Sequence, residues 1–146
     1  MILTTHFTLE EMVHSETAVR LGIDNEPDSD VISNLRTLCV YLERVRDLLG
    51  YPITISSGYR SLALNSALKG SPTSAHCRGL AADFICPRFG EPKDCAKMIA
   101  ESTVKFDQLI YEGTWVHFGI ASDGMRGQIL TAHFGNGPVT YSQGIA

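Results

Sequence analysis

The chain has 146 residues, a formal net charge of −4 and 44% hydrophobic residues, which is typical of one globular domain. A domain of this length buries roughly two thirds of its unfolded surface, so it needs no disulfide to fold. The twelve lysines and arginines are scattered without a basic stripe, which argues against a nucleic-acid partner.

The chain begins with Met-Ile-Leu-Thr-Thr-His-Phe, which has no positive region and no long apolar run. We therefore expect no signal peptide, no membrane span and synthesis in the cytoplasm, with outside help needed for any action beyond the cell. The four cysteines fall at irregular spacings without a Cys-x-x-Cys pair, which favours reduced thiols. We expect a monomer with a single domain over residues 1–146.

Helical signals dominate the first third of the chain. Thr8-Leu-Glu-Glu11 is a capping box that predicts a short helix to about Ser15, and a helical turn follows from Ser15 to Gly22. Asp28 or Ser29 then begins a long helix. Its apolar positions follow helical spacing as far as Gly50, which ends it: Val31, Leu35, Leu38, Leu42, Val45, Leu48 and Leu49.

The middle of the chain alternates between strands and short helices. Residues 53–56 are predicted to form a strand, and residues 61–68 a short helix that is followed by the polar loop 71–74. The apolar run 80–86 predicts a buried strand. A helix is expected from about residue 92 to residue 102, because it begins at a proline that suits a first helical turn.

A hairpin is predicted between residues 106–112 and 115–121, with Gly113-Thr114 as a two-residue loop. This register pairs Ile110 with His117. Paired residues of a hairpin share a face, so Glu112, Trp115 and His117 are expected to point the same way. Val116, Phe118 and Ile120 are then expected to face the core.

The remaining residues complete the expected fold. Residues 128–134 are predicted to form an edge strand, and the tail 135–146, rich in glycine and small residues, is expected to be loosely held. The fold class is therefore α+β, a small and mainly antiparallel sheet with helices packed on one face. The domain core is expected over about residues 5–132.

Three side chains form a candidate metal site: His76, Asp83 and His117. Two neutral imidazoles and one carboxylate suit a catalytic zinc ion, because they leave a fourth position for water. His76 precedes the predicted strand 80–86 in a turn, and Asp83 lies on that strand, so the two can converge on one ion. The other histidines have no partner at ligand spacing and are expected to be structural: His6, His14 and His133.

Two further residues are candidates for catalysis. In the predicted hairpin, Glu112 lies about 7–8 Å from His117 on the diagonal, which suits a carboxylate that acts on water without ligating the metal. Arg60 follows a predicted strand end near the histidine motif. A cation there can polarise a scissile carbonyl, hold a carboxylate, or simply be solvated.

Three polar or aromatic residues are candidates for substrate binding. Ser74 caps the loop before His76 or donates a hydrogen bond to substrate, and the sequence leaves both readings open. Trp115 is expected to form a wall of the cleft, with core packing as the alternative. Gln108 shares the predicted face of Glu112 and is therefore within reach of a bound substrate.

The motif Ser74-x-His76-x-x-Gly79-x-Ala81-x-Asp83, with Ser57-Gly-Tyr-Arg60 before it and Trp115-x-His117 after it, resembles the zinc peptidases that cut peptidoglycan peptides. That family includes D-alanyl-D-alanine carboxypeptidases, D-alanyl-D-alanine dipeptidases and phage L-alanyl-D-glutamate endolysins. The resemblance covers about residues 5–132. It implies a Hedgehog-like α+β fold, one zinc ion on the two histidines and the aspartate, and an arginine near the bound water.

The resemblance also implies a catalytic acid on the strand that leads into Trp115-x-His117. Many family members carry this acid three residues before the last histidine, where this chain has Thr114. The nearest acidic residue is Glu112, and a subgroup with Asp-Gln-Leu-Ile-x-Glu followed by Trp-Val-His is more similar to this chain. The hairpin geometry independently turns Glu112 toward the metal site, so we assign it the role of general base.

The predicted function is zinc-dependent hydrolysis of stem-peptide bonds in bacterial peptidoglycan. Endopeptidase and carboxypeptidase action remain open, although a domain without an export signal favours a phage-type lysin that acts on intact wall after release. The main alternative is a non-catalytic zinc-containing binding or structural module, for instance in a phage particle, which would have no use for Glu112. A cysteine enzyme built on Cys77 is disfavoured because His76 is its sequence neighbour.

Overall fold

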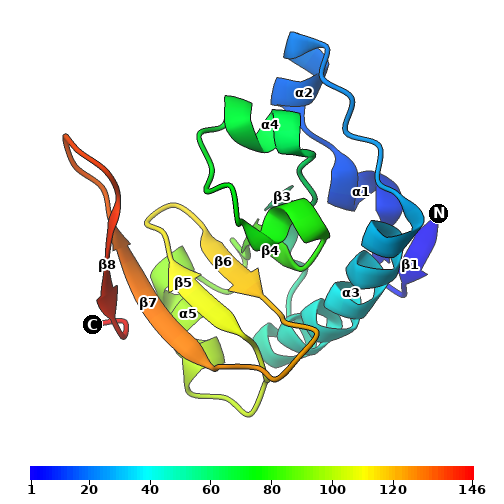
Figure 1. Ribbon diagram of the computed structural model, residues 1–146. Helices are drawn as coiled ribbons and strands as arrows, with labels where there is room; N and C mark the ends of the chain where they lie inside the picture. Colours follow the sequence, from blue (N-terminus) through cyan, green and yellow to red (C-terminus); the bar gives the residue numbers. More distant parts are fainter.

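The computed structural model describes residues 1–146, and its centre is a six-stranded sheet with strand order β3-β4-β6-β5-β7-β8 (Figure 1). All neighbouring strands are antiparallel except β5 and β7, which are parallel. The strands are β3 (Thr54–Ser57), β4 (Ala81–Ile85), β5 (Gln108–Tyr111), β6 (Val116–Gly119), β7 (Gln128–His133) and β8 (Thr140–Gln143). The expected α+β class with a mainly antiparallel sheet is confirmed.

The helices begin and end where the capping residues predict. Thr8, Ser15 and Asp28 each accept a backbone N–H in the first turn of the helix that follows, and Gly50 adopts the left-handed conformation after the long helix. The helices are α1 (Leu9–Val13), α2 (Glu16–Leu21), α3 (Ser29–Leu49), α4 (Leu62–Ala67) and α5 (Pro92–Ala100). No helix has both the length and the apolar character that a membrane span requires.

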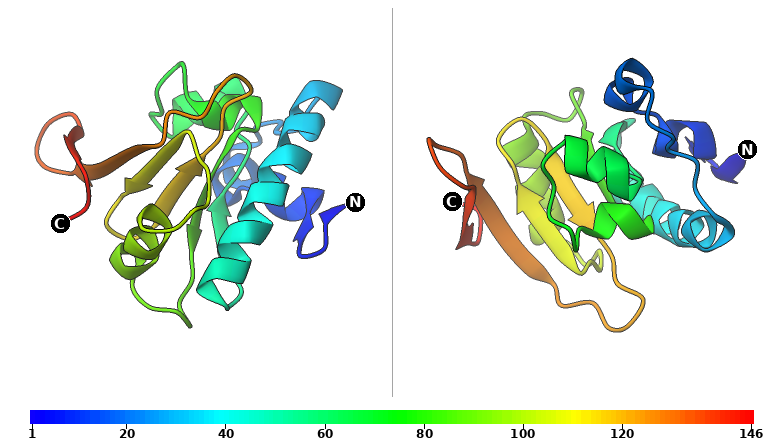
Figure 2. Two further views of the ribbon diagram at one scale, coloured as in Figure 1. Left: turned by 90° about the horizontal axis from the view of Figure 1, so that it is seen from below. Right: turned by 45° about the horizontal axis from the view of Figure 1, so that its top comes forward.

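One face of the sheet carries the hydrophobic core. Helices α3 and α5 lie against this face (Figure 2). The alternation of side chains on β4 and β6 turns Ala82, Phe84, Val116 and Phe118 into the same buried cluster. Asp83 and His117 therefore point to the opposite face, next to the short 3-10 helix η1 (Ala75–Arg78) and α4.

The hairpin of β5 and β6 has the predicted register. Ile110 pairs with His117, and the backbone N–H of Glu112 donates to the carbonyl of Trp115, which closes a two-residue loop. Gly113 takes the positive φ of 81° that this loop requires. In this register Glu112 and Trp115 lie opposite each other at the loop end of the hairpin, and His117 follows two residues after Trp115.

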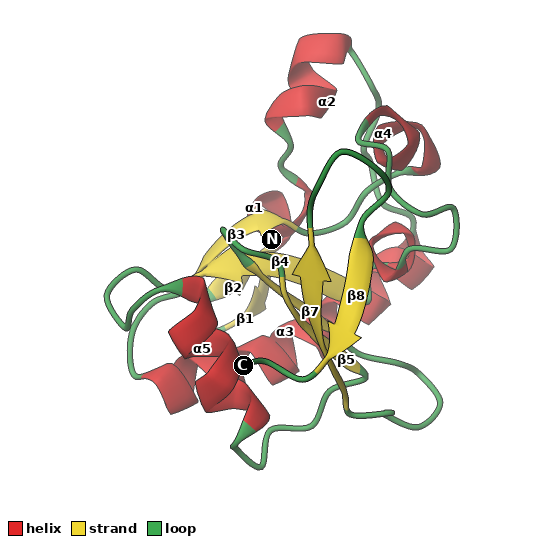
Figure 3. Cartoon of the chain, turned by 90° about the vertical axis from the view of Figure 1, so that its left-hand side faces the viewer, coloured by secondary structure: helices red, strands yellow, loops and turns green.

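The C-terminal third differs from the prediction in two respects. The strand expected at the sheet edge, β7, is an inner strand, and Thr140–Gln143 of the expected loose tail forms β8 beside it (Figure 3). β6 ends beside the start of β5. The short loop after β6 crosses this end of β5 and leads into β7, which therefore runs parallel to β5. Backbone hydrogen bonds hold the loop: Gly127 donates to Phe106, and Gln128 to Asp107.

Candidate active site

Three elements bring the predicted metal ligands together. His76 lies on η1, Asp83 on β4 and His117 on β6, where Asp83 and His117 face each other in the antiparallel register. Asp83 Oδ1 is 3.3 Å from His76 Nε2 and 3.0 Å from His117 Nδ1. One ligand atom from each side chain lies within 4.8 Å of the others; the side chains of His76 and Asp83 are buried, and that of His117 is 11% exposed.

The surroundings of His76 fix which ring nitrogen is available to a metal. His76 Nδ1 lies 2.7 Å from the carbonyl oxygen of Gly58, which can only accept a hydrogen bond, so Nδ1 carries the proton. The lone pair is then on Nε2, the atom that faces Asp83. At the backbone, the N–H of His76 donates to Ser74 Oγ, so Ser74 caps the short helix that carries the ligand.

Asp83 is held in the ionised form that a metal ligand needs. Burial alone raises its pKa, but the adjacent His76 and His117 in their protonated forms lower it more, and the net pKa lies well below the ordinary value. A buried carboxylate between two imidazoles, with one histidine tautomer fixed by a backbone carbonyl, is a donor set that suits zinc. The residues of this chain therefore fit the ion that the motif predicts.

Arg60 lies against the ligand Asp83. Its Nη2 is 3.3 Å from Asp83 Oδ2, the oxygen that the two histidines do not contact. Its Nε donates to Ser57 Oγ, and its Nη1 is 3.4 Å from Asn65 Oδ1. Asn65 is buried and donates to the carbonyl of Ser71, which ties Arg60 to the loop before η1. These contacts orient the guanidinium at the edge of the metal cluster.

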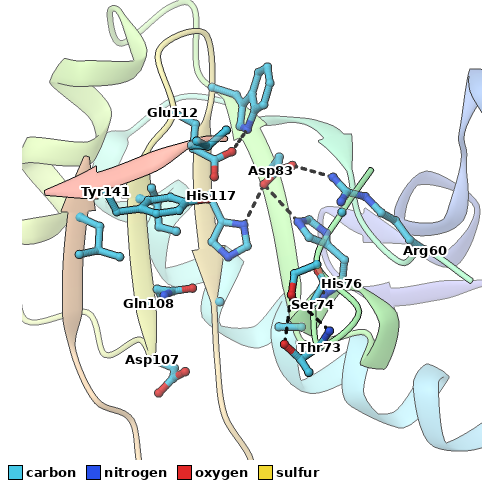
Figure 4. Close-up of a pocket in the computed structure, with 18 of the residues that line it drawn as sticks. Arg60, Thr73, Ser74, His76, Asp83, Asp107, Gln108, Glu112, His117 and Tyr141 are labelled. Carbon is cyan, nitrogen blue, oxygen red and sulfur yellow. Dashed lines mark hydrogen bonds and ion pairs between the residues drawn. The ribbon is translucent and has the colours of Figure 1, made fainter. Parts of the chain in front are cut away.

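Glu112 lies on the hairpin beside the metal cluster (Figure 4). The indole N–H of Trp115 donates to Glu112 Oε2, which leaves Oε1 for another partner. Burial, and then the charge of Asp83, raise the pKa of Glu112 above its ordinary value. A carboxylate with a raised pKa is more basic, as a general base near neutral pH requires.

The predicted substrate-binding residues all line one cleft of about 840 Å³ together with the metal cluster. Ser74 borders it at the start of η1, and Trp115 at the hairpin loop. Gln108 lies on its floor, where its amide nitrogen is 2.9 Å from the amide oxygen of Gln128. The structure thus places Ser74, Gln108 and Trp115 in one cavity, and their contact with substrate stays a prediction.

A second groove of about 460 Å³ adjoins the first beside Asp83. Arg60, Asp83 and Trp115 line both cavities, whereas His76 and His117 line the first cavity alone. The far side of the second groove consists of β3 and the turn between α1 and α2. Its lining there includes His14, Ser15, Thr17, Ser56 and Tyr59.

Sequence reasoning did not single out three residues that shape the site. Gly58 stands within the Ser-Gly-Tyr-Arg motif, but its role depends on a carbonyl contact across 18 residues. Asn65 lies in the predicted short helix 61–68, and nothing in the sequence pattern indicates that this polar residue is buried. Tyr141 lies in the tail and borders the cleft. By contrast, Cys77 does not line the cleft, and burial raises the pKa of its thiol, which weighs against a thiolate nucleophile.

A comparison with protein families identifies the family of this chain. The model of a protein family described as Peptidase M15 matches residues 5–119. No curated protein matches the chain. The matched region contains the three candidate ligands and Glu112, and it ends where β6 ends, before β7 and β8.

Proposed function

The chain belongs to the peptidase M15 family, and from this premise we propose that it hydrolyses peptide bonds in the stem peptides of bacterial peptidoglycan with one bound zinc ion. The observation that carries the proposal is the convergence of His76, Asp83 and His117 beside a carboxylate that is not a ligand, Glu112. A purely structural metal site does not require a carboxylate beside an open coordination position.

The residues divide the reaction between them. Zinc, when held by His76, Asp83 and His117, supplies the Lewis acid that activates water and polarises the scissile carbonyl. Glu112 accepts the proton of the attacking water and passes it to the nitrogen of the leaving amine. The Trp115 indole holds one oxygen of Glu112, so the other oxygen keeps a fixed direction for these proton transfers.

Arg60 has two roles in this proposal. It neutralises Asp83 Oδ2 and so fixes the ligand that lies between the two histidines. A guanidinium has five N–H donors, and the three contacts above use three of them. The remaining donors are available to the carbonyl oxygen of a substrate, whose negative charge grows during attack.

The joined grooves favour endopeptidase action. A carboxypeptidase that removes one terminal residue needs room for chain on one side of the bond only. Here the cluster lines a cavity of about 840 Å³, and a second cavity of about 460 Å³ adjoins it beside Asp83; both volumes are within the roughly 300–1,000 Å³ that is common for ligand pockets. A peptide can therefore extend on both sides of the scissile bond, as cleavage within intact peptidoglycan requires.

The decisive test is the substitution Glu112→Gln. The variant should keep one zinc per chain and lose activity by at least the roughly hundredfold that removal of a general base costs. Elemental analysis measures the zinc, and mass spectrometry of digests of purified peptidoglycan measures the activity. Glu101→Gln, at an exposed position after α5, is the matched control and should behave as the parent.

The same assay identifies the bond that is cut. Parallel incubations with intact peptidoglycan, a free stem pentapeptide and D-alanyl-D-alanine separate endopeptidase, carboxypeptidase and dipeptidase action. We expect cleavage within stem peptides of the intact polymer. If all three substrates survive with zinc bound, the enzyme proposal is wrong and a zinc-containing binding module takes its place.

A further inference from the structure

The strand β8 lies outside the region that matches the peptidase family, yet it borders the same cleft. Val139 and Tyr141, together with Leu130 of β7, line the cavity that contains His117 and Glu112. Figure 4 shows the Tyr141 ring directed from β8 toward His117 and Glu112. Partial burial, and then the charge of Glu112, raise the pKa of the Tyr141 hydroxyl, in agreement with this position.

The register explains why Tyr141 faces the cleft. It pairs with Ala132 of β7, and paired residues share a face of the sheet. Ala132, Leu130 and Ile110 form a small hydrophobic cluster on the cleft side, separate from the main core. Thr140 and Ser142, the neighbours of Tyr141 along β8, point to the other face.

Tyr141 is not needed for the packing of the fold. The residue is 52% exposed, and its hydroxyl forms no hydrogen bond within the chain. An aromatic ring that is half exposed beside a reactive cluster, next to a strip of apolar side chains, offers surface to a ligand instead. Around this strip the cleft is polar, with Asp107 paired to Arg126. An apolar side chain of a bound peptide can therefore pack on this strip, and in the proposed stem-peptide substrate the apolar side chains are those of alanine.

We propose that β8 completes the substrate site, with the ring of Tyr141 and the side chains of Leu130 and Val139 packing against an alanine side chain of the substrate beside the scissile bond. This inference rests on the proposed peptidase function and names the residues that select its substrate. It makes Tyr141 a specificity residue supplied by a strand that lies beyond the matched family region.

The test measures binding without turnover. Trp115 is the only tryptophan of the chain and lines the cleft, so its fluorescence reports occupancy. In zinc-loaded Glu112→Gln protein, titration with a stem pentapeptide ending in D-alanyl-D-alanine gives the Kd. A second pentapeptide carries glycine in place of each alanine. Adding Tyr141→Ala should raise the Kd for the first peptide about tenfold and remove most of the difference between the peptides.

Two further variants separate the ring from other effects. Tyr141→Phe should bind within about twofold of the parent, because the ring surface is kept. Thr140→Ala, on the outer face of the same strand, should leave the Kd unchanged. The proposed packing of substrate against Tyr141 is wrong if Tyr141→Ala leaves the Kd unaltered, or if Tyr141→Phe weakens binding as much as Tyr141→Ala does. In either case the peptidase proposal stands. Absence of any binding by the Glu112→Gln parent overturns both.

Discussion

Arg60 shows how one side chain links the metal cluster to the loops around it. Its guanidinium contacts Asp83, Ser57 and Asn65, which belong to three separate segments. Because Asp83 and Asn65 are buried, loss of the arginine would leave their oxygens without this donor in a site that water reaches poorly. We therefore expect Arg60 to orient the candidate ligand Asp83, in addition to any contact with substrate.

The first prediction at this scale concerns zinc affinity. Arg60→Ala should weaken zinc binding by roughly ten- to hundredfold, as loss of a hydrogen-bonded partner of a ligand does in other sites. It should also lower the free energy of unfolding by about 1–3 kcal/mol. Competition with a chelator measures the affinity, and thermal unfolding the stability.

Arg60→Lys and an exposed arginine provide the comparison. Lysine keeps the charge but not the planar fork, so Arg60→Lys should recover only part of the affinity. Arg20→Ala, on the exposed side of α2, should change neither quantity. Unchanged zinc affinity in Arg60→Ala would show that Arg60 does not position Asp83.

Residue types were the most predictable part of the site. His76, Asp83 and His117 are identifiable because two of them lie on predicted strands whose alternation fixes a common face. The partners of these ligands are not identifiable in this way. The Gly58 carbonyl and Asn65 reach the site through loops, and the path of a loop depends on the packing of elements that are distant in sequence.

At the scale of elements, the end of β3 is held between α1 and η1. The N–H of Tyr59 donates to the carbonyl of Met12 over 2.8 Å, and the carbonyl of Gly58 accepts from His76. A Cβ on Gly58 would lie 2.2 Å from the Met12 carbonyl oxygen, closer than any real contact. Glycine is therefore required here for the close approach of two backbones rather than for an unusual φ.

Gly58→Ala is the prediction at this scale. The methyl group must push the β3 loop away from α1, which should cost about 1–3 kcal/mol of stability, as overpacking does elsewhere. Because the same peptide orients His76, zinc affinity should fall as well. Thermal unfolding and chelator competition measure the two effects. Gly135→Ala, where a Cβ meets nothing within 4 Å, is the control. Equal stability and equal zinc affinity of the two variants would contradict the role of Gly58 in holding β3 between α1 and η1.

Local sequence signals predict the ends of the helices more accurately than the pairing of the strands. The caps at Thr8, Asp28 and Gly50 are sequence-local, so they predict helix ends directly. The parallel pairing of β7 with β5 is not local, because it depends on where the loop 120–127 crosses the end of β5. The strand β8 is short and exposed, and its sequence is Thr-Tyr-Ser-Gln. Because glycines surround this segment, its composition is typical of a loop and does not predict a strand.

At the scale of the whole molecule, the candidate metal ligands come from parts of the chain that are far apart in sequence. His76 comes from η1, and the two other ligands come from the central strands β4 and β6, which also carry core residues on their opposite face. A ligand that binds only the folded chain stabilises it by mass action. Zinc should therefore stabilise the fold as a whole and not the cleft alone.

The prediction that follows is a zinc-dependent melting temperature. At a free zinc concentration about 100 times its Kd, binding adds about 2.7 kcal/mol to the free energy of unfolding. For a domain of this size, each kcal/mol shifts the melting temperature by roughly 2–4 °C, so chelation should lower it by about 5–10 °C. His117→Ala should lose most of the metal and with it the response to zinc. His133→Ala, on the outer face of β7, should keep both. If zinc does not change the melting temperature of the parent protein, the three side chains do not form a metal site.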